Sequence, residues 1–276
     1  MENSNKIGFI GAGNMAYALI SGLIESGFST QNIKLSDTDT SLLSQRKLEF
    51  GLEVFTNNSQ LSEQCEVIVL AVKPQILPVV CKEIQAYLNH KPLIISIAAG
   101  VKSVDINRWL GGNAAIVRTM PNTPALLGKG ATGLFANEAV NEEQKHLASL
   151  ILGAVGYCVW IKDEPMLDAV TALSGSGPAY FFLMMESMTN AGIELGLDSE
   201  TAEKLSIQTA LGAAMMAEQS GKSVGELRDN VTSKGGTTQA AIASFQNQNF
   251  ELVVANAMHA AFERAKAMGD ELGKNE

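Results

Sequence analysis

Cysteine and histidine are scarce in this chain, and their scarcity removes several kinds of chemistry. Only three of the 276 residues are cysteine and three are histidine. The cysteines are far apart and form no Cys-x-x-Cys pair, so the sequence predicts neither a disulfide framework nor a zinc site. They are Cys65, Cys81 and Cys158. The single histidines are interpreted as surface or packing residues, and no metal site is expected: His90, His146 and His259.

Excess positive charge and long apolar runs are also missing. The net charge is −9, and nucleic acids attract basic surfaces, so nucleic acid is excluded as the expected partner. No run reaches the roughly 18 apolar residues of a membrane span. The polar start Met1–Lys6 leads directly into an apolar run without a signal-peptide pattern. With its unpaired cysteines, the chain is expected in the reducing cytoplasm.

The first 160 residues alternate short apolar runs with amphipathic stretches. Strands that alternate with helices predict a mainly parallel sheet covered on both faces. The predicted strands are Ile7–Ile10, Ile33–Leu35, Val67–Val72, Leu93–Ile97, Ala115–Arg118, Gly133–Ala136 and Tyr157–Ile161. The predicted helices between them are Met15–Ser26, Ser41–Phe50, Ile76–Leu88, Val104–Leu110 and Asn141–Leu152.

After Lys162 only helical patterns remain. We therefore predict two domains, a dinucleotide-binding domain over residues 1–162 and an all-helical domain over 163–276. Ser199 is predicted to cap one of these helices. Several helices are rich in alanine and methionine on more than one face, which favours burial against a second subunit. The predicted helices are Pro165–Leu173, Pro178–Leu195, Ser199–Gln219, Val224–Asp229, Thr237–Asn247 and Phe250–Leu272.

A Gly-x-Gly-x-x-Ala motif follows the first predicted strand and opens a helix. Gly11 permits the tight turn, Gly13 allows a pyrophosphate to approach the backbone, and Ala16 permits close packing of helix and strand. In this position the motif predicts binding of a dinucleotide.

The end of the second strand bears on which dinucleotide binds. An acid there favours the ribose diol of NAD, whereas a nearby arginine favours the 2′-phosphate of NADP. Asp37 is such an acid, and no arginine precedes Arg46. Asp37 and Asp39 are equally compatible with capping the next helix. Ser36, Thr38 and Thr40 offer hydroxyl groups to a phosphate, so the choice of cofactor stays open.

Two further strand ends carry candidate cofactor contacts, because open α/β sheets bind ligands at the carboxyl ends of their strands. Lys73 follows the fourth strand and is interpreted either as a contact to the cofactor or as a solvated turn residue. Ala98 and Ala99 follow the fifth strand, where small side chains allow a nicotinamide to lie against the backbone.

Two segments rich in glycine and hydroxyl side chains stand out in the helical half. They are Gly175–Tyr180 and Asn230–Thr238. Backbone N–H groups and hydroxyls in such segments bind anions such as carboxylates. Together with the dinucleotide motif, they indicate an enzyme that brings a nicotinamide to a small carboxylate-bearing substrate.

These motifs resemble the pyrroline-5-carboxylate reductase family over about residues 7–264. The resemblance rests on Phe9–Met15, Ala71–Pro74, Ser96–Val101, Arg118–Ala125, Leu173–Tyr180 and Leu227–Thr238. It implies an α/β fold with a Rossmann-type dinucleotide-binding domain followed by an all-helical dimerisation domain. It also implies a homodimer, which in this family assembles further, and NADPH-dependent reduction of 1-pyrroline-5-carboxylate to L-proline, with NADH as the alternative cofactor.

The resemblance also implies the site residues. For the cofactor these are Ile10, Gly11, Ala12, Gly13, Asn14, Met15, Ser36, Asn58, Ala71, Val72, Lys73, Pro74 and Asn230. For the substrate they are Glu164, Ser176, Ser233, Gly236, Thr237 and Thr238, with Ser233 and Thr238 as the catalytic pair. Lys234 stands where the family usually has proline, which implies a less rigid loop or added positive charge near the carboxylate.

Two rival functions are weaker. A β-hydroxyacid dehydrogenase needs a proton acceptor. The motif typical of that family is a Gly-rich helix start followed by a lysine about one turn later. Residues 174–190 contain no Lys, Arg or His. A non-enzymatic NADPH-binding regulator would not need the Gly-Gly-Thr-Thr segment. Reduction of a cyclic imine needs neither a metal nor a nucleophile, only a hydride donor, a proton for the ring nitrogen and correct orientation.

Overall fold

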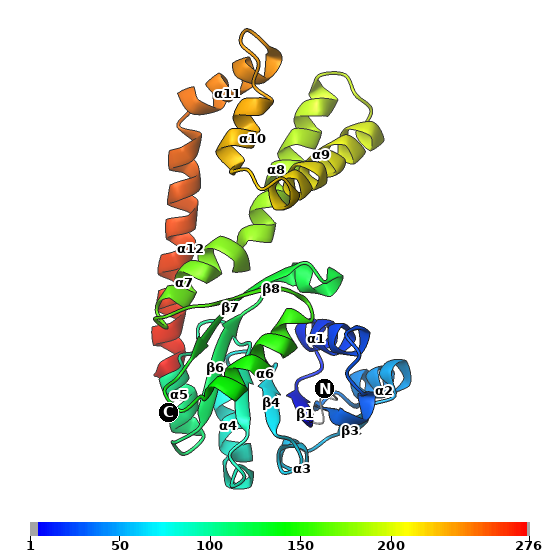
Figure 1. Cartoon of the computed structure of the whole chain (residues 1–276), viewed down its shortest axis with the longest axis vertical. Coiled ribbons are helices and arrows are strands. Elements are labelled where there is room, and N and C mark those ends of the chain that lie inside the picture. Colours follow the sequence, from blue (N-terminus) through cyan, green and yellow to red (C-terminus); the bar gives the residue numbers. More distant parts are fainter. Residues whose placement is uncertain (1–4, 275–276) are drawn as a thin grey trace. The chain divides into compact units, whose positions relative to one another are not determined.

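A central sheet organises the first part of the chain (Figure 1). The computed structural model describes residues 5–274, and eight strands lie within that range. They are β1 (Ile7–Ile10), β2 (Ile33–Ser36), β3 (Glu53–Phe55), β4 (Val67–Leu70), β5 (Leu93–Ser96), β6 (Ala115–Met120), β7 (Gly130–Ala136) and β8 (Gly156–Trp160).

The strand order is β3-β2-β1-β4-β5-β6-β7-β8, and the first six strands are parallel. β7 runs antiparallel to β6, and β8 runs parallel to β7. The chain moves outward in one direction from β1 to β3 and in the other from β4 to β6. Such a reversal leaves a crevice at the carboxyl ends of the strands beside β1, where ligands bind in open sheets.

Helices cover both faces of the sheet. They are α1 (Asn14–Glu25), α2 (Thr40–Phe50), α3 (Asn58–Ser62), α4 (Leu77–Ile84), α5 (Ser103–Trp109) and α6 (Glu142–Gly153). One core contains α1 and α6 residues, and the other contains residues of α3, α4 and α5. Strands β1, β2, β4 and β5 are buried along their whole length, because their side chains alternate between the two faces of the sheet.

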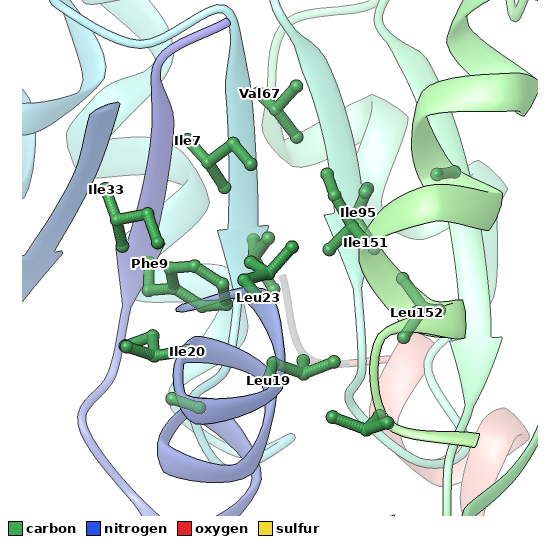
Figure 2. Packing of buried hydrophobic residues seen from close by; sticks show 14 of the residues in the cluster. Ile7, Phe9, Leu19, Ile20, Leu23, Ile33, Val67, Ile95, Ile151 and Leu152 are labelled. Carbon is green, nitrogen blue, oxygen red and sulfur yellow. The ribbon is translucent and has the colours of Figure 1, made fainter. Parts of the chain in front are cut away.

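Figure 2 shows the first core, in which Phe9 of β1 lies among Leu19 and Ile20 of α1. Phe9 is fully buried there, whereas its neighbour Ile10 belongs to the core on the opposite face. The prediction of a mainly parallel sheet with two covered faces is therefore confirmed.

The rest of the chain is helical. Its elements are α7 (Met166–Val170), a π-helical turn (Thr171–Gly175), α8 (Gly177–Glu194), α9 (Ser199–Gln219), α10 (Val224–Asn230), α11 (Thr237–Asn247) and α12 (Phe250–Gly273). By internal packing, Met1–Ser176 and Ala261–Glu276 form one compact unit, and Gly177–Ala260 forms another. We call them the sheet unit and the helical unit. The predicted domain boundary between residues 162 and 163 stays a prediction.

The last turns of α12 belong to the sheet unit. Leu272 is buried in the core beneath α5, and a Cβ at Gly269 would lie 2.8 Å from the carbonyl oxygen of Gly100. Lys102 Nζ lies 2.6 Å from the Asp270 carboxylate. These contacts fix the end of the chain against α5 and the loop that precedes it.

Few residues of the helical unit are buried within the single chain. Its helices α8 and α9 pack against each other, yet only Gly177, Ala202 and Ser206 are buried among residues 177–260. Large apolar side chains remain exposed on both helices, including Phe181, Phe182, Leu183, Ile207, Leu211, Met215 and Met216. No helix within residues 5–274 is both long and apolar enough to cross a bilayer.

The element boundaries differ from the predictions in ways that local chemistry explains. β3 and α3 were not predicted, because each is only three to five residues long, which is too short for a clear periodic pattern. The prediction that Ser199 caps α9 is wrong, since Asp198 is the N-cap and accepts from the Thr201 N–H at 2.9 Å. The predicted helix over residues 76–88 ends earlier, with α4 followed by a 3₁₀ turn over Gln85–Tyr87.

Candidate active site

The turn after β1 has a shape that only glycine permits. Gly11 has a φ of 104°, in the left-handed region. A Cβ at this position would lie 2.5 Å from the carbonyl oxygen of Ala71, at the end of β4. The Gly11 N–H donates to the carbonyl of Ser36 at 2.8 Å. The turn is therefore held against both strands that flank β1.

The N-terminus of α1 faces open space. Its N-cap, Gly13, has no side chain to accept from the first-turn N–H groups, and no acidic residue lies in that turn. A Cβ at Gly13 would meet nothing within 4 Å. Uncapped N–H groups at a helix N-terminus bind phosphate groups. The turn and helix therefore fit the pyrophosphate of a dinucleotide.

Most of the predicted cofactor residues come together at one edge of the sheet. Ile10–Met15 follows β1, Ser36 ends β2, Ala71–Pro74 follows β4, and Ala98 and Ala99 follow β5. Because these strands are parallel, their carboxyl ends lie at the same edge. Two members lie elsewhere in the chain: Asn58 begins α3, and Asn230 ends α10 in the helical unit.

The structure separates the roles of the two acids after β2. Asp39 caps α2 by accepting from the N–H groups of Ser41 and Leu42. Asp37 instead accepts from the Ala12 N–H at 2.7 Å, and its second oxygen accepts from the Asp39 N–H at 2.9 Å. Asp37 and Asp39 were each interpreted as a ribose contact or as a cap of the next helix, and only Asp39 caps that helix. Asp37 places its carboxylate against the Gly-rich turn.

Ser36 and Asn58 are in direct contact. The Ser36 hydroxyl donates to Asn58 Oδ1 at 2.8 Å, and Asn58 Nδ2 donates to Glu83 Oε2 at 2.8 Å. Ser36 is fully buried, whereas Glu83 is exposed on the last turn of α4. Ser36 and Asn58, which were predicted as separate cofactor contacts, thus belong to one chain of hydrogen bonds at the end of β2.

The loops after β4 and β5 are open to a ligand. Lys73 is exposed, and its carbonyl accepts from the Ile76 N–H at 2.9 Å in the turn that precedes α4. Ala98 is buried and its N–H points to the hydroxyl of Ser96 at 3.4 Å. Both loops therefore present backbone and one cationic side chain rather than bulky groups.

The predicted substrate segment lies in the helical unit, between α10 and α11. Gly235 has a φ of 76°, and its N–H donates to the Gln239 side chain at 2.6 Å. The next residue, Gly236, is the N-cap of α11 and supplies no side-chain cap. Thr237 and Thr238 form the first turn. This start of α11 offers N–H groups and hydroxyls to an anion.

Glu164 lies in the sheet unit within a network of hydrogen bonds. Its carboxylate accepts from the N–H and the hydroxyl of Ser103, each at 2.6 Å, and from Arg118 Nη1 at 3.2 Å. Arg118 is buried and also lies 3.6 Å from Asp168. Burial raises the pKa of the Asp168 carboxyl, and the Arg118 and Lys102 charges oppose that rise. An open cavity of about 580 Å³ borders Glu164.

Ser176 closes the π-helical turn that follows α7. Its N–H donates to the Thr171 carbonyl at 2.8 Å. The turn is held by Asn122, which follows β6 and whose Nδ2 donates to the Ser174 carbonyl at 2.9 Å. Single π turns in helices are frequent at functional sites. The Gly-Ser-Gly segment is therefore an irregular, fixed backbone rather than a regular helix start.

Sequence reasoning missed three residues that shape these sites. Arg118 and Asn122 belong to a motif that supported the resemblance, but they received no role. Glu83 is one of two charged residues in α4, and no local pattern marks it. A basic residue within a buried strand was the available signal for Arg118, because such a charge needs a partner. Within residues 5–274, no group of three or more His, Cys, Asp or Glu residues could hold a metal.

Family models match both parts of the chain. A model described as "Pyrroline-5-carboxylate reductase dimerisation" matches residues 164–268. A model described as "NADP oxidoreductase coenzyme F420-dependent" matches residues 6–100. The two parts of the predicted fold class are therefore confirmed, a dinucleotide-binding sheet domain followed by a helical dimerisation domain.

Relatives match nearly the full length. A pyrroline-5-carboxylate reductase from Pseudomonas aeruginosa is 48% identical, with 98% of each chain covered. The solved structure of a pyrroline-5-carboxylate reductase from Coxiella burnetii has a TM-score of 0.93 and 44% identity, covering 96% of this chain and 99% of that one. A Plasmodium falciparum pyrroline carboxylate reductase with NADP bound has a TM-score of 0.85 and 36% identity, covering 98% and 99%. With this identity along almost its entire length, the chain belongs to the pyrroline-5-carboxylate reductase family.

Proposed function

We propose that this chain reduces 1-pyrroline-5-carboxylate to L-proline with a nicotinamide dinucleotide as the hydride donor. One observation carries the proposal: the chain matches a member of this family over 98% of each sequence and retains both the Gly-rich turn before α1 and the uncapped glycine start of α11. The first feature suits a pyrophosphate and the second a carboxylate.

The cofactor half of the site uses the turn and strand ends of the sheet unit. The N–H groups at the start of α1 bind the pyrophosphate, and Ser36 and Asn58 face the adenosine ribose beside the end of β2. The loops over Ala71–Pro74 and Ala98–Ala99 border the nicotinamide side of the crevice. Asn230, in the helical unit, is a further proposed cofactor residue. When bound, the cofactor supplies the hydride that adds to the C=N carbon, and the ring nitrogen takes up a proton before or during the step.

The substrate half of the site uses the start of α11. The backbone of Gly236 and Thr237 and the hydroxyls of Ser233 and Thr238 grip the substrate carboxylate. Orientation of the ring toward the nicotinamide is worth about 7–11 kcal/mol of barrier in such reactions. Lys234, exposed in the same segment, adds positive charge near the anion. Glu164 and Ser176 complete the proposed set.

Both NADPH and NADH are proposed to serve, with a modest preference for NADPH. Support comes from the family model named for an NADP oxidoreductase and from the relative with NADP bound. The acids near the end of β2 limit that preference, because Asp37 accepts from the turn that a cofactor phosphate would approach. An arginine pairs with a 2′-phosphate more strongly than neutral hydroxyl and amide groups do.

A homodimer in the cytoplasm is the proposed state, with further assembly of dimers. The matched dimerisation model and the exposed apolar side chains of α8 and α9 support the dimer. Three unpaired cysteines support a reducing compartment.

Cofactor absorbance tests the proposal directly. Purified protein is mixed with NADPH and 1-pyrroline-5-carboxylate, and proline is measured in the same samples. We expect oxidation of NADPH that depends on the imine and equals the proline formed. No turnover of the imine by protein that binds NADPH would contradict the proposed reaction. Oxidation of 3-hydroxyisobutyrate with NAD would instead favour the hydroxyacid dehydrogenase alternative.

A further inference from the structure

Glu83 stands at the end of a hydrogen-bonded chain that reaches the proposed ribose position. Asn58 Nδ2 donates to Glu83 Oε2 at 2.8 Å, and Ser36 donates to Asn58 Oδ1 at 2.8 Å. The Glu83 backbone is placed by contact between α3 and α4, where the Ser59 hydroxyl lies 3.4 Å from the Glu83 carbonyl. None of the sequence motifs includes Glu83.

The carboxylate sets the direction of every bond in this chain. An ionised carboxylate only accepts hydrogen bonds, so the Asn58 amide must turn its NH₂ group toward Glu83. Its carbonyl oxygen then faces Ser36 and accepts the single hydroxyl proton of that residue. Ser36 Oγ keeps lone pairs that accept no hydrogen bond within this chain of residues. The second N–H of Asn58 is available to any acceptor.

This polarity suits a ribose hydroxyl better than a phosphate. A 2′-hydroxyl can donate to the lone pairs of Ser36, whereas a 2′-phosphate carries only acceptors at neutral pH. To donate to a phosphate, Ser36 must abandon the Asn58 carbonyl, or Asn58 must turn and lose its bond to Glu83. The negative charge of Glu83 adds repulsion toward a phosphate.

We propose that Glu83 is a specificity-determining residue that fixes this hydrogen-bond direction and thereby lowers the preference for a 2′-phosphorylated cofactor. The proposal rests on the proposed function, which places Ser36 and Asn58 at the adenosine ribose. Glu83 acts through Asn58 and is a positioning residue. Without its carboxylate, Asn58 can turn, donate to Ser36 Oγ, and free the Ser36 proton for a phosphate.

The test compares dissociation constants for NADP⁺ and NAD⁺, measured by calorimetry without substrate. Glu83→Gln keeps the side-chain shape and removes the charge. Glu63→Gln is the matched control, because this exposed residue ends α3 and removes an equal charge. We expect Glu83→Gln to shift the ratio of the two constants about fivefold toward NADP⁺, the size typical of a partly exposed charged pair. The control should retain the wild-type ratio.

A second background separates hydrogen-bond direction from simple charge. In Ser36→Ala protein the chain has no hydroxyl to redirect, so adding Glu83→Gln should give only the smaller shift that comes from removing the negative charge. A full shift in that background, an equal shift in Glu63→Gln, or no shift in Glu83→Gln would each overturn the proposal. If wild-type protein bound neither dinucleotide, both this proposal and the proposed function would fail. Binding of both with an unmoved ratio would overturn the role of Glu83 alone.

Discussion

Large apolar side chains are buried in the sheet unit but exposed in the helical unit. In the sheet unit, Phe9 and Leu19 are fully buried between strand and helix. In the helical unit, Phe181 and Phe182 are 69% and 63% exposed, and no large apolar side chain is buried. Fully burying one such side chain contributes about 1.5–3 kcal/mol. The sheet unit therefore has a complete core within one chain, whereas the helical unit lacks one.

This difference indicates where each part of the activity resides. The sheet unit presents a rigid Gly-rich turn, fixed by its own backbone contacts. The proposed substrate segment lies on helices that have few buried neighbours in the single chain. We infer that cofactor binding needs only the fold of one chain, whereas substrate binding depends on assembly. Obligate interfaces of this kind resemble a protein core cut in half.

The largest expected effect comes from a charge placed on the exposed apolar surface of the helical unit. Met215→Glu should abolish the dimer and the activity, because a buried unpaired carboxylate would lie in the interface. Leu48→Glu is the control, since Leu48 is 89% exposed on α2 of the sheet unit. Sedimentation velocity and NADPH oxidation are measured on both variants. A Met215→Glu protein that sediments and reacts like wild type would remove α9 from the interface.

Thiol reactivity provides the next contrast, because all three cysteines lie in the sheet unit. Burial raises the pKa of the Cys65 and Cys81 thiols from 9.0 to about 12 and that of Cys158 to about 11. At about pH 8, Cys65 and Cys81 should react roughly a thousandfold more slowly than free thiols, because the thiolate is the reactive form.

The raised thiol pKa also has a consequence for stability. Folding favours the neutral thiols, so their contribution to the free energy of unfolding is fully present below about pH 9. It is lost as the pH rises toward the folded pKa of about 12. In the Met215→Glu variant, Cys65 and Cys81 should still react slowly with thiol reagents at about pH 8. Rapid labelling of Cys65 and Cys81 in that variant would show that the sheet unit depends on assembly after all.

Thr238→Ala tests the substrate half of the site. Removal of a hydrogen bond to a charged group costs about 1.5–3 kcal/mol, so kcat/KM for the imine should fall about 10- to 150-fold. The dissociation constant for NADPH should not change. Thr238→Ser retains the hydroxyl and should recover most of the activity. Equal kinetics in Thr238→Ala and wild type would exclude the hydroxyl from the site.

Asp37→Asn tests the cofactor half and should have the smallest effect. The variant removes a charge but keeps an acceptor for the Ala12 N–H. We expect the kcat/KM ratio to shift about threefold toward NADPH, the scale of one partly exposed charge, with an unchanged KM for the imine. Asp37→Ala should shift the ratio similarly and weaken both cofactors, because Ala12 loses its partner. An unmoved ratio in both variants would show that the Asp37 charge does not reach the ribose.

The sequence was sufficient for features that depend on local patterns. Alternating apolar runs predicted the sheet and its two covered faces, and Gly11 and Gly13 predicted the turn. Contacts between distant segments could not be read in this way. The bond from Asp37 to Ala12 joins residues 25 positions apart, and that from Glu83 to Asn58 also spans 25. Such pairs depend on strand order and helix packing, which no short motif encodes.

Sedimentation of the unmodified chain at low micromolar concentration tests the central claim most directly. We infer that the helical unit is completed only by a second copy. We therefore expect a dimer or a larger assembly, with no folded monomer present. A monomer that retains the full helical content of the chain would contradict it, because the exposed side chains of α8 and α9 would then be stable without a partner.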